Sequence, residues 1–171
     1  MKIKRYISIL LMIIVGFILQ TTIFDYLELA GVKPNIMIVI TAASGFMFGR
    51  RYGMFAGGIC GALMDLLYSD IIGMSILLYV FIGFLNGLAN KLYFKDDLAI
   101  PLTAIGISDV LYGVVFYILS FMLRGRLGII AYLRQVILPE TIYTVIIGIF
   151  IYKFIHWLDS KLYPPVEVPL E

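Results

Sequence analysis

Six long apolar segments divide this chain of 171 residues, and short polar or glycine-containing turns separate them. A transmembrane helix needs about 20 mostly apolar residues to cross the ~30 Å hydrocarbon core of a bilayer. The composition agrees with this reading, because 62% of the residues are hydrophobic and 14% are charged, whereas soluble domains are about half apolar and a quarter charged. The segments predict about six membrane-spanning helices, at residues 6–24, 34–48, 53–68, 74–90, 101–124 and 139–157.

The expected architecture is all-α: a single polytopic membrane domain, residues 1–163, followed by a mobile proline-rich tail, residues 164–171. A basic leader precedes the first apolar segment, which has no small-residue cleavage site. We therefore expect a retained first helix rather than a cleaved signal peptide. Residues 125–136 mix apolar clusters with two arginines, which favours a segment that lies in the membrane interface.

The lysines and arginines indicate how the bundle is oriented. If the N-terminus lies in the cytoplasm, nine of the 13 lysines and arginines fall on the cytoplasmic side and four fall on the other side. Cationic residues translocate poorly, so short cytoplasmic loops carry an excess of them. We expect a multi-pass protein of the bacterial inner membrane with both termini in the cytoplasm. The nine expected cytoplasmic residues are Lys2, Lys4, Arg5, Arg50, Arg51, Lys91, Lys95, Lys153 and Lys161.

Small residues recur at helical spacing in the third and fourth segments. Gly53, Gly57 and Gly61 lie four residues apart, and Gly83 and Gly87 repeat this spacing in the next segment. Residues four apart share one face of a helix, and a face without side chains lets another helix approach closely. We expect the two rows to pack against each other, with a partner subunit's helix as the alternative.

Two aspartates fall inside predicted spans, where a charge is costly and marks a candidate functional residue. Asp65 lies near the C-terminal end of its helix, where the helix dipole disfavours an anion. We therefore expect a cation from the outer loop to pair with it. The candidates are Arg124, Arg126 and Arg134.

The second aspartate, Asp109, lies beside Ser108 and is predicted to lie near Asn86 and Asn90 of the fourth segment. An internal polar cluster that fixes helix register is the favoured interpretation, and an ion or ligand site is the alternative. At 1.5 Å per residue, Asp65 lies about 20 Å and Asp109 about 12 Å from the cytoplasmic face. This difference in depth argues against a pair of carboxylates that share a proton.

Several chemistries have no support in the sequence. The motifs GxxxxGK[ST], HExxH and GxSxG are absent, and the chain contains one cysteine and one histidine. We therefore expect no catalytic residues, no metal site and no cofactor. The net charge of +2 is too small to indicate a nucleic-acid partner.

Two stretches carry a resemblance to a known family. They are LQTTIFDYLELAGVKPNIMIVI and GRRYGMFAGGICGALMDLLYSDIIGMSILLYVFIGFLNGLANKLYF. With the basic start and the six predicted spans, the chain resembles the MreD family of bacterial rod shape-determining membrane proteins over about residues 5–160. The landmarks are Gln20, the Lys33-Pro34 pair, the Arg50-Arg51 turn, the glycine row that leads to Asp65, and Tyr79 with Gly83.

The resemblance implies a non-enzymatic scaffold of the elongation complex. Such a protein binds membrane lipids and an MreC-like partner, acts with an MreB-type cytoskeleton and peptidoglycan synthases, and helps direct lateral peptidoglycan synthesis and cell shape. The family also resembles in fold the substrate-binding S components of energy-coupling-factor vitamin transporters, which gives the alternative function. S components typically carry an AxxxA row on the first helix, whereas this chain has no alanine before Ala30.

Overall fold

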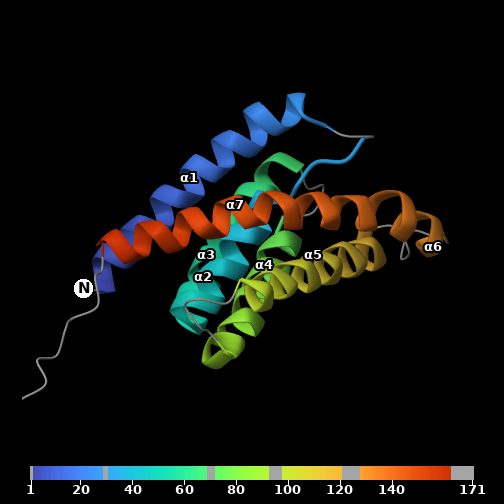
Figure 1. The fold of residues 1–171 in the computed structure, drawn as a ribbon. Helices are drawn as coiled ribbons and strands as arrows, with labels where there is room; N and C mark the ends of the chain where they lie inside the picture. Colours follow the sequence, from blue (N-terminus) through green and yellow to red (C-terminus); the bar gives the residue numbers. More distant parts are fainter. Residues whose placement is uncertain (1, 29–30, 69–71, 93–97, 121–127, 163–171) are drawn as a thin grey trace, which may run out of the picture.

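The computed structural model of the protein describes residues 2–28, 31–68, 72–92, 98–120 and 128–162. These residues form helices and connecting turns, and no strand occurs among them, which confirms the all-α prediction (Figure 1). The α-helices are α1 Lys2–Tyr26, α2 Ile36–Phe48, α3 Arg50–Tyr68, α4 Met74–Leu88, α5 Ala99–Ser120, α6 Ile129–Tyr132 and α7 Leu138–Leu162. A 3-10 helix, η1 Ala89–Leu92, extends α4, and a π-helical turn, η3 Leu133–Ile137, joins α6 to α7.

Four of the described helical stretches are long and apolar enough to cross a membrane: Ile3–Phe24, Met74–Lys91, Ala99–Ser120 and Ile129–Leu162. The other two predicted spans correspond to α2, with 13 residues, and α3, with 19 residues. Helix α2 is only about 20 Å long at 1.5 Å per residue, which is less than the hydrocarbon thickness. Its surroundings in the bundle explain how so short an apolar helix is accommodated.

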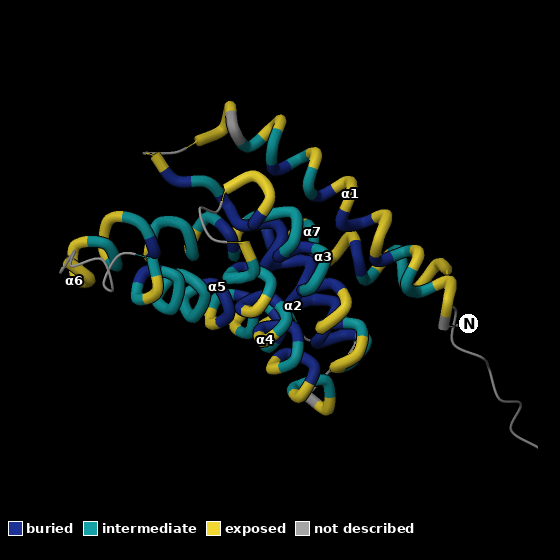
Figure 2. The backbone as a smooth tube through the Cα atoms, turned by 180° about the vertical axis from the view of Figure 1, so that it is seen from behind, coloured by how far each residue is buried: buried dark blue, intermediate teal, exposed yellow. Residues whose placement is uncertain are grey.

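Helix α2 lies at the centre of the bundle. It contacts α1, α3, α4, α5 and α7, and 12 of its 13 residues are buried. The buried part of the backbone is concentrated around this helix (Figure 2). A helix that is apolar on all sides is stable where protein surrounds it on all sides. Because protein rather than lipid covers α2, the bilayer thickness does not set its length.

Helices α1 and α7 lie at the outside of the bundle, and exposed residues recur along their length (Figures 1 and 2). On α1, residues Ile7, Leu11 and Ile18 are more than half exposed. Ile142 and Phe150 on α7 are also more than half exposed. Apolar outer faces of this kind are suited to contact with lipid or with other membrane helices.

The expected interfacial segment is not separate from the last helix. Helical structure continues from Ile129 through the π-helical turn to Leu162, so residues 129–136 are continuous with the last predicted span. Their expected location in the membrane interface stays a prediction. One inserted residue in a helical turn produces a π-bulge without ending the helix. Residues 125–127, and the predicted end of the fifth span at Arg124, lie outside the described residues.

Candidate functional site

The two predicted glycine rows face each other across the contact between α3 and α4. A Cβ atom on Gly83 would collide with the backbone carbonyl of Gly53, and a Cβ on Gly57 would collide with the carbonyl of Tyr79. A Cβ on Gly61 would lie 2.7 Å from the carbonyl oxygen of Ser75. The two backbones are therefore in direct contact, which only glycine permits. The chain uses this surface to join its own helices.

The same contact extends to two further positions. A Cβ atom on Gly87 would collide with the Cα of Arg50, where α3 begins. On α2, a Cβ on Gly45 would lie 2.7 Å from the carbonyl oxygen of Gly83. The sequence analysis did not single out Gly45, because it is the one glycine inside the predicted span 34–48, and Gly49, four residues later, was assigned to the turn.

Asp65 binds the N-terminal end of α4. Its Oδ2 accepts hydrogen bonds from the backbone N–H groups of Gly73 at 2.7 Å and Ile76 at 3.2 Å. Its Oδ1 accepts one from the N–H of Ser75 at 2.9 Å. The first N–H groups of a helix have no partner within the helix, and the helix dipole favours an anion beside them. The carboxylate is 2% exposed, and α4 provides stabilisation that the sequence argument assigned to a cation.

The ion pair expected for Asp65 remains a prediction. Arg124 and Arg126 lie outside the described residues. Arg134 lies in the π-helical turn before α7 and is exposed. The sequence argument considered only the helix to which Asp65 belongs, whereas its three described hydrogen-bond partners belong to the turn before α4 and to α4 itself.

Asn35 is a buried polar residue that the sequence analysis did not single out. Its Oδ1 accepts hydrogen bonds from the N–H of Ile38 at 3.2 Å and from the hydroxyl of Tyr79 at 2.8 Å. Its own N–H donates to Oγ1 of Thr144 at 3.0 Å. Asn35 therefore caps α2 and connects it to α4 and α7. An asparagine directly before an apolar segment is a sequence signal for such a cap.

Gln20 of α1 supports the same end of α2. Its Oε1 accepts a hydrogen bond from the N–H of Met37 at 3.2 Å, and its Nε2 donates to Sδ of Met64 on α3 at 3.7 Å. Gln20 is buried although it lies on the outermost helix. Gln20 therefore positions α1 against α2 and α3.

The polar residues expected near Asp109 form separate contacts. Nδ2 of Asn86 donates to Oγ of Ser108 at 2.7 Å, and Nδ2 of Asn90 donates to the carbonyl oxygen of Phe46 at the end of α2 at 2.6 Å. Each asparagine thus joins α4, or its 3-10 extension, to a different helix. The rotation of each helix decides these pairings, and residue spacing alone does not specify it.

Asp109 itself faces α7. Its Oδ2 accepts a hydrogen bond from Oγ1 of Thr141 at 2.8 Å. Its Oδ1 is buried and has no hydrogen-bond partner in the described part of the chain. A buried carboxylate with one unpaired oxygen is costly, so Asp109 remains a candidate functional residue.

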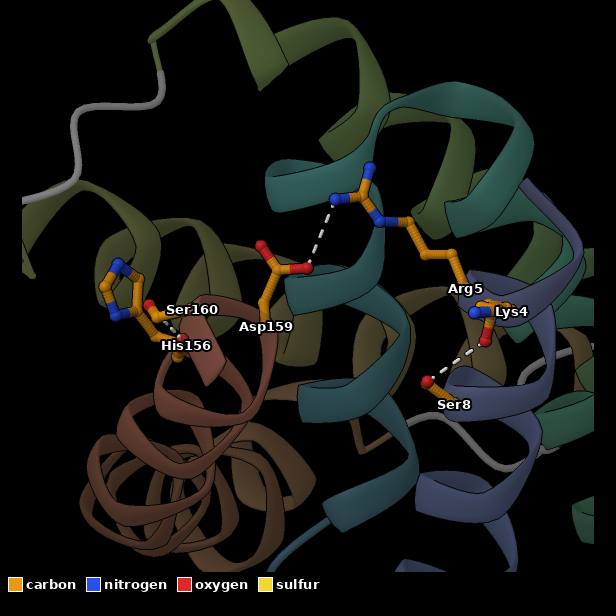
Figure 3. Close-up of polar contacts among 6 residues, drawn as sticks. All are labelled: Lys4, Arg5, Ser8, His156, Asp159 and Ser160. Carbon is orange, nitrogen blue, oxygen red and sulfur yellow. Dashed lines mark hydrogen bonds and ion pairs between the residues drawn. The ribbon is translucent and has the colours of Figure 1, made fainter. Parts of the chain in front are cut away.

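One end of the bundle gathers basic and aromatic side chains. Arg5 of α1 forms an ion pair with Asp159 of α7 at 3.2 Å (Figure 3). The guanidinium of Arg5 also lies 4.8 Å from the ring centre of Phe48 and 5.9 Å from that of Tyr52. These contacts bring together the start of α1, the turn between α2 and α3, and the end of α7. We call this the basic end, and its described cations are Lys4, Arg5, Arg50, Arg51, Lys91 and Lys161.

The described residues define a class of protein. Polar side chains mainly join helices to each other, apolar side chains cover the outside, and no group of three metal-binding side chains occurs among the residues searched. This is the organisation of a multi-pass helical membrane protein.

Comparison with protein families is consistent with this class. The family model described as rod shape-determining protein MreD matches residues 1–161. The chain belongs to the MreD family. No curated protein and no solved structure matches it, and the expected likeness to S components stays a prediction.

Proposed function

We propose that this rod shape-determining protein is a non-enzymatic scaffold subunit of the bacterial elongation complex. It binds an MreC-like partner, acts with an MreB-type cytoskeleton and peptidoglycan synthases, and helps direct lateral peptidoglycan synthesis. Membership of the MreD family supports the proposal. The observation that carries it is the location of polar side chains between the helices and of apolar side chains on the outside of the bundle. Polar groups join its own helices, while the outer faces of α1 and α7 offer apolar surface to other helices.

We also propose that the protein lies in the inner membrane with both termini in the cytoplasm. The Arg5–Asp159 ion pair supports this orientation, because it brings the start of α1 and the end of α7 to the same end of the bundle. The cations at the basic end support a cytoplasmic location for that end. Reporter fusions at the two termini test this, and activity of the two reporters on opposite sides of the membrane would contradict it.

Depletion and copurification test the scaffold function. We expect cells depleted of the protein to lose their rod shape, and we expect the MreC-like protein of the same bacterium to copurify with it from detergent-solubilised membranes. A bacterium that keeps its shape on depletion, with no MreC-like protein recovered, would overturn the proposal. Detergent-matched purification of an unrelated multi-pass protein is the control for nonspecific recovery.

The variant Asp109→Asn distinguishes the scaffold function from transport or proton transfer, which would depend on the charge of Asp109. Asparagine preserves an acceptor for Thr141 and removes the charge. A scaffold retains rod shape and partner recovery in this variant, with Glu28→Gln, at an exposed position, as the control for loss of a carboxylate. Loss of rod shape with normal protein level and normal partner recovery would instead indicate transport or proton transfer.

A further inference from the structure

An open apolar groove runs along the outer surface of α3 and α4. It has a volume of about 570 Å³ and is lined by Met54 of α3 and by six residues from Gly73 to Phe84. No lining residue carries a charge or a side-chain hydrogen-bonding group. We call it the α3–α4 groove. Leu77 is 67% exposed and Phe81 is 50% exposed, so the groove is open at the outer surface of the bundle.

Three cations of the basic end, Arg50, Arg51 and Lys91, follow the α3–α4 groove where Met54 and Phe84 line it. Arg50 and Arg51 precede Met54 by four and three residues, so they lie one helical turn away on the same side of α3. Lys91 follows Phe84 by seven residues, or about two turns. The backbone of Arg50 packs against Gly87 of α4, which places these cations at the boundary between the two helices.

The three cations are available to a ligand. All three side chains are exposed. Within the part of the chain that the structure describes, the ion pair found is the one between Arg5 and Asp159, and none of the three cations takes part in it. An exposed cation beside a membrane attracts anionic lipid.

We propose that the α3–α4 groove binds an anionic phospholipid. One acyl chain lies along the apolar groove beside Phe81 and Phe84, and the phosphate-bearing head group lies against Arg50, Arg51 and Lys91. Charge complementarity selects this occupant, because an apolar groove that leads to three cations matches a molecule with a hydrocarbon chain and an anionic end. A neutral lipid would fill the groove without using the cations.

Fluorescence quenching by brominated lipids tests the proposal at the groove. The chain has one tryptophan, Trp157, so the double variant Trp157→Phe, Phe81→Trp has a single reporter in the groove. In vesicles, we expect phosphatidylglycerol with brominated acyl chains to quench this reporter more than brominated phosphatidylcholine at the same mole fraction. The matched control is Trp157→Phe, Phe150→Trp, which reports on a 68% exposed position on α7. There the two lipids should quench equally.

Two charge variants test the role of the cations. In the triple variant Arg50→Gln, Arg51→Gln, Lys91→Gln, the preference of the groove reporter for phosphatidylglycerol should fall by about tenfold or more, since each cation contributes to the attraction. The triple variant Lys4→Gln, Lys153→Gln, Lys161→Gln removes the same charge from α1 and α7 and should keep the preference. Equal quenching of the groove reporter by both lipids, or equal loss of preference in both triple variants, would overturn the proposal.

Native mass spectrometry of the unmodified protein gives an independent measurement. After equal exposure to both lipids, we expect more bound phosphatidylglycerol than phosphatidylcholine, and equal retention would count against the proposal. A purified complex with an MreC-like partner in which neither brominated lipid quenches the groove reporter would show that a partner helix fills the groove. That result would also overturn the proposal, while leaving the scaffold function intact.

Discussion

The carboxylate of Asp65, near the end of α3, accepts a hydrogen bond at 2.9 Å from the backbone N–H of Ser75, in the first turn of α4. With the bonds from Gly73 and Ile76, this side chain satisfies three N–H groups. It therefore stabilises the turn between the two helices whose glycine rows are in contact.

Asp65→Ala should lower the free energy of unfolding by about 1–3 kcal/mol, because it leaves N–H groups at the start of α4 without an acceptor. Asp65→Asn should cost less, since it keeps one acceptor oxygen. Cys60 is the single cysteine and is fully buried, so its reaction with a thiol-reactive fluorophore reports unfolding in detergent. Glu28→Ala, at an exposed position, is the control. An Asp65→Ala protein as stable as this control would contradict the capping role.

Gly83→Ala should destabilise the bundle by at least about 1–3 kcal/mol, because its methyl group would collide with the carbonyl of Gly53 and force the backbones apart. Gly58→Ala is the matched control on α3. There the nearest atom to the added methyl group is Cγ2 of Val80 at 3.7 Å, so we expect a neutral change or a gain of up to about 1 kcal/mol from higher helix propensity. The same thiol assay measures both. Equal effects of the two alanines would argue against a tight contact at Gly83.

Tyr79→Phe should cost about 1 kcal/mol or somewhat more, because it removes the hydroxyl that donates to Oδ1 of Asn35 and leaves the ring in place. Tyr26→Phe is the matched control, since Tyr26 is 89% exposed, and it should have no measurable effect. Thermal unfolding of both variants in the same detergent gives the comparison. If the two substitutions were equivalent, the hydrogen bond between α4 and the cap of α2 would contribute no stability.

Arg5 and Asp159 should show a small favourable coupling, at most about 1 kcal/mol, in a double-mutant cycle with Arg5→Gln and Asp159→Asn, because the pair is partly exposed. The coupling should decrease at high salt, which screens exposed charges. Arg5→Gln alone should cost more than Lys4→Gln, since Arg5 also packs on the ring of Phe48. A coupling that does not change with salt would indicate that the two charges do not interact across the basic end.

The local properties of the chain explain why much of the fold was predictable. Runs of consecutive apolar residues mark each helical segment, so the segments and the class of membrane protein could be predicted from the sequence. The glycine rows were also visible, because their spacing is that of one helix face, and the structure places the row at Gly53 against Gly83. The start of α4 at Met74 likewise lies where the sequence placed it. The predicted turn at Arg50-Arg51 was wrong, because α3 begins at Arg50 and both arginines lie in its first turn.

The tertiary structure decided the polar contacts. Asp65 pairs with backbone groups of the following helix, Asp109 pairs with Thr141, 32 residues away, and Asn35 pairs with Tyr79, 44 residues away. Each pairing depends on how far one helix is rotated and shifted against another, which residue spacing within a single helix does not specify. The sequence by itself determined which segments leave water. Only the packing of those segments determined which buried polar groups meet, since each must find its partner inside the bundle.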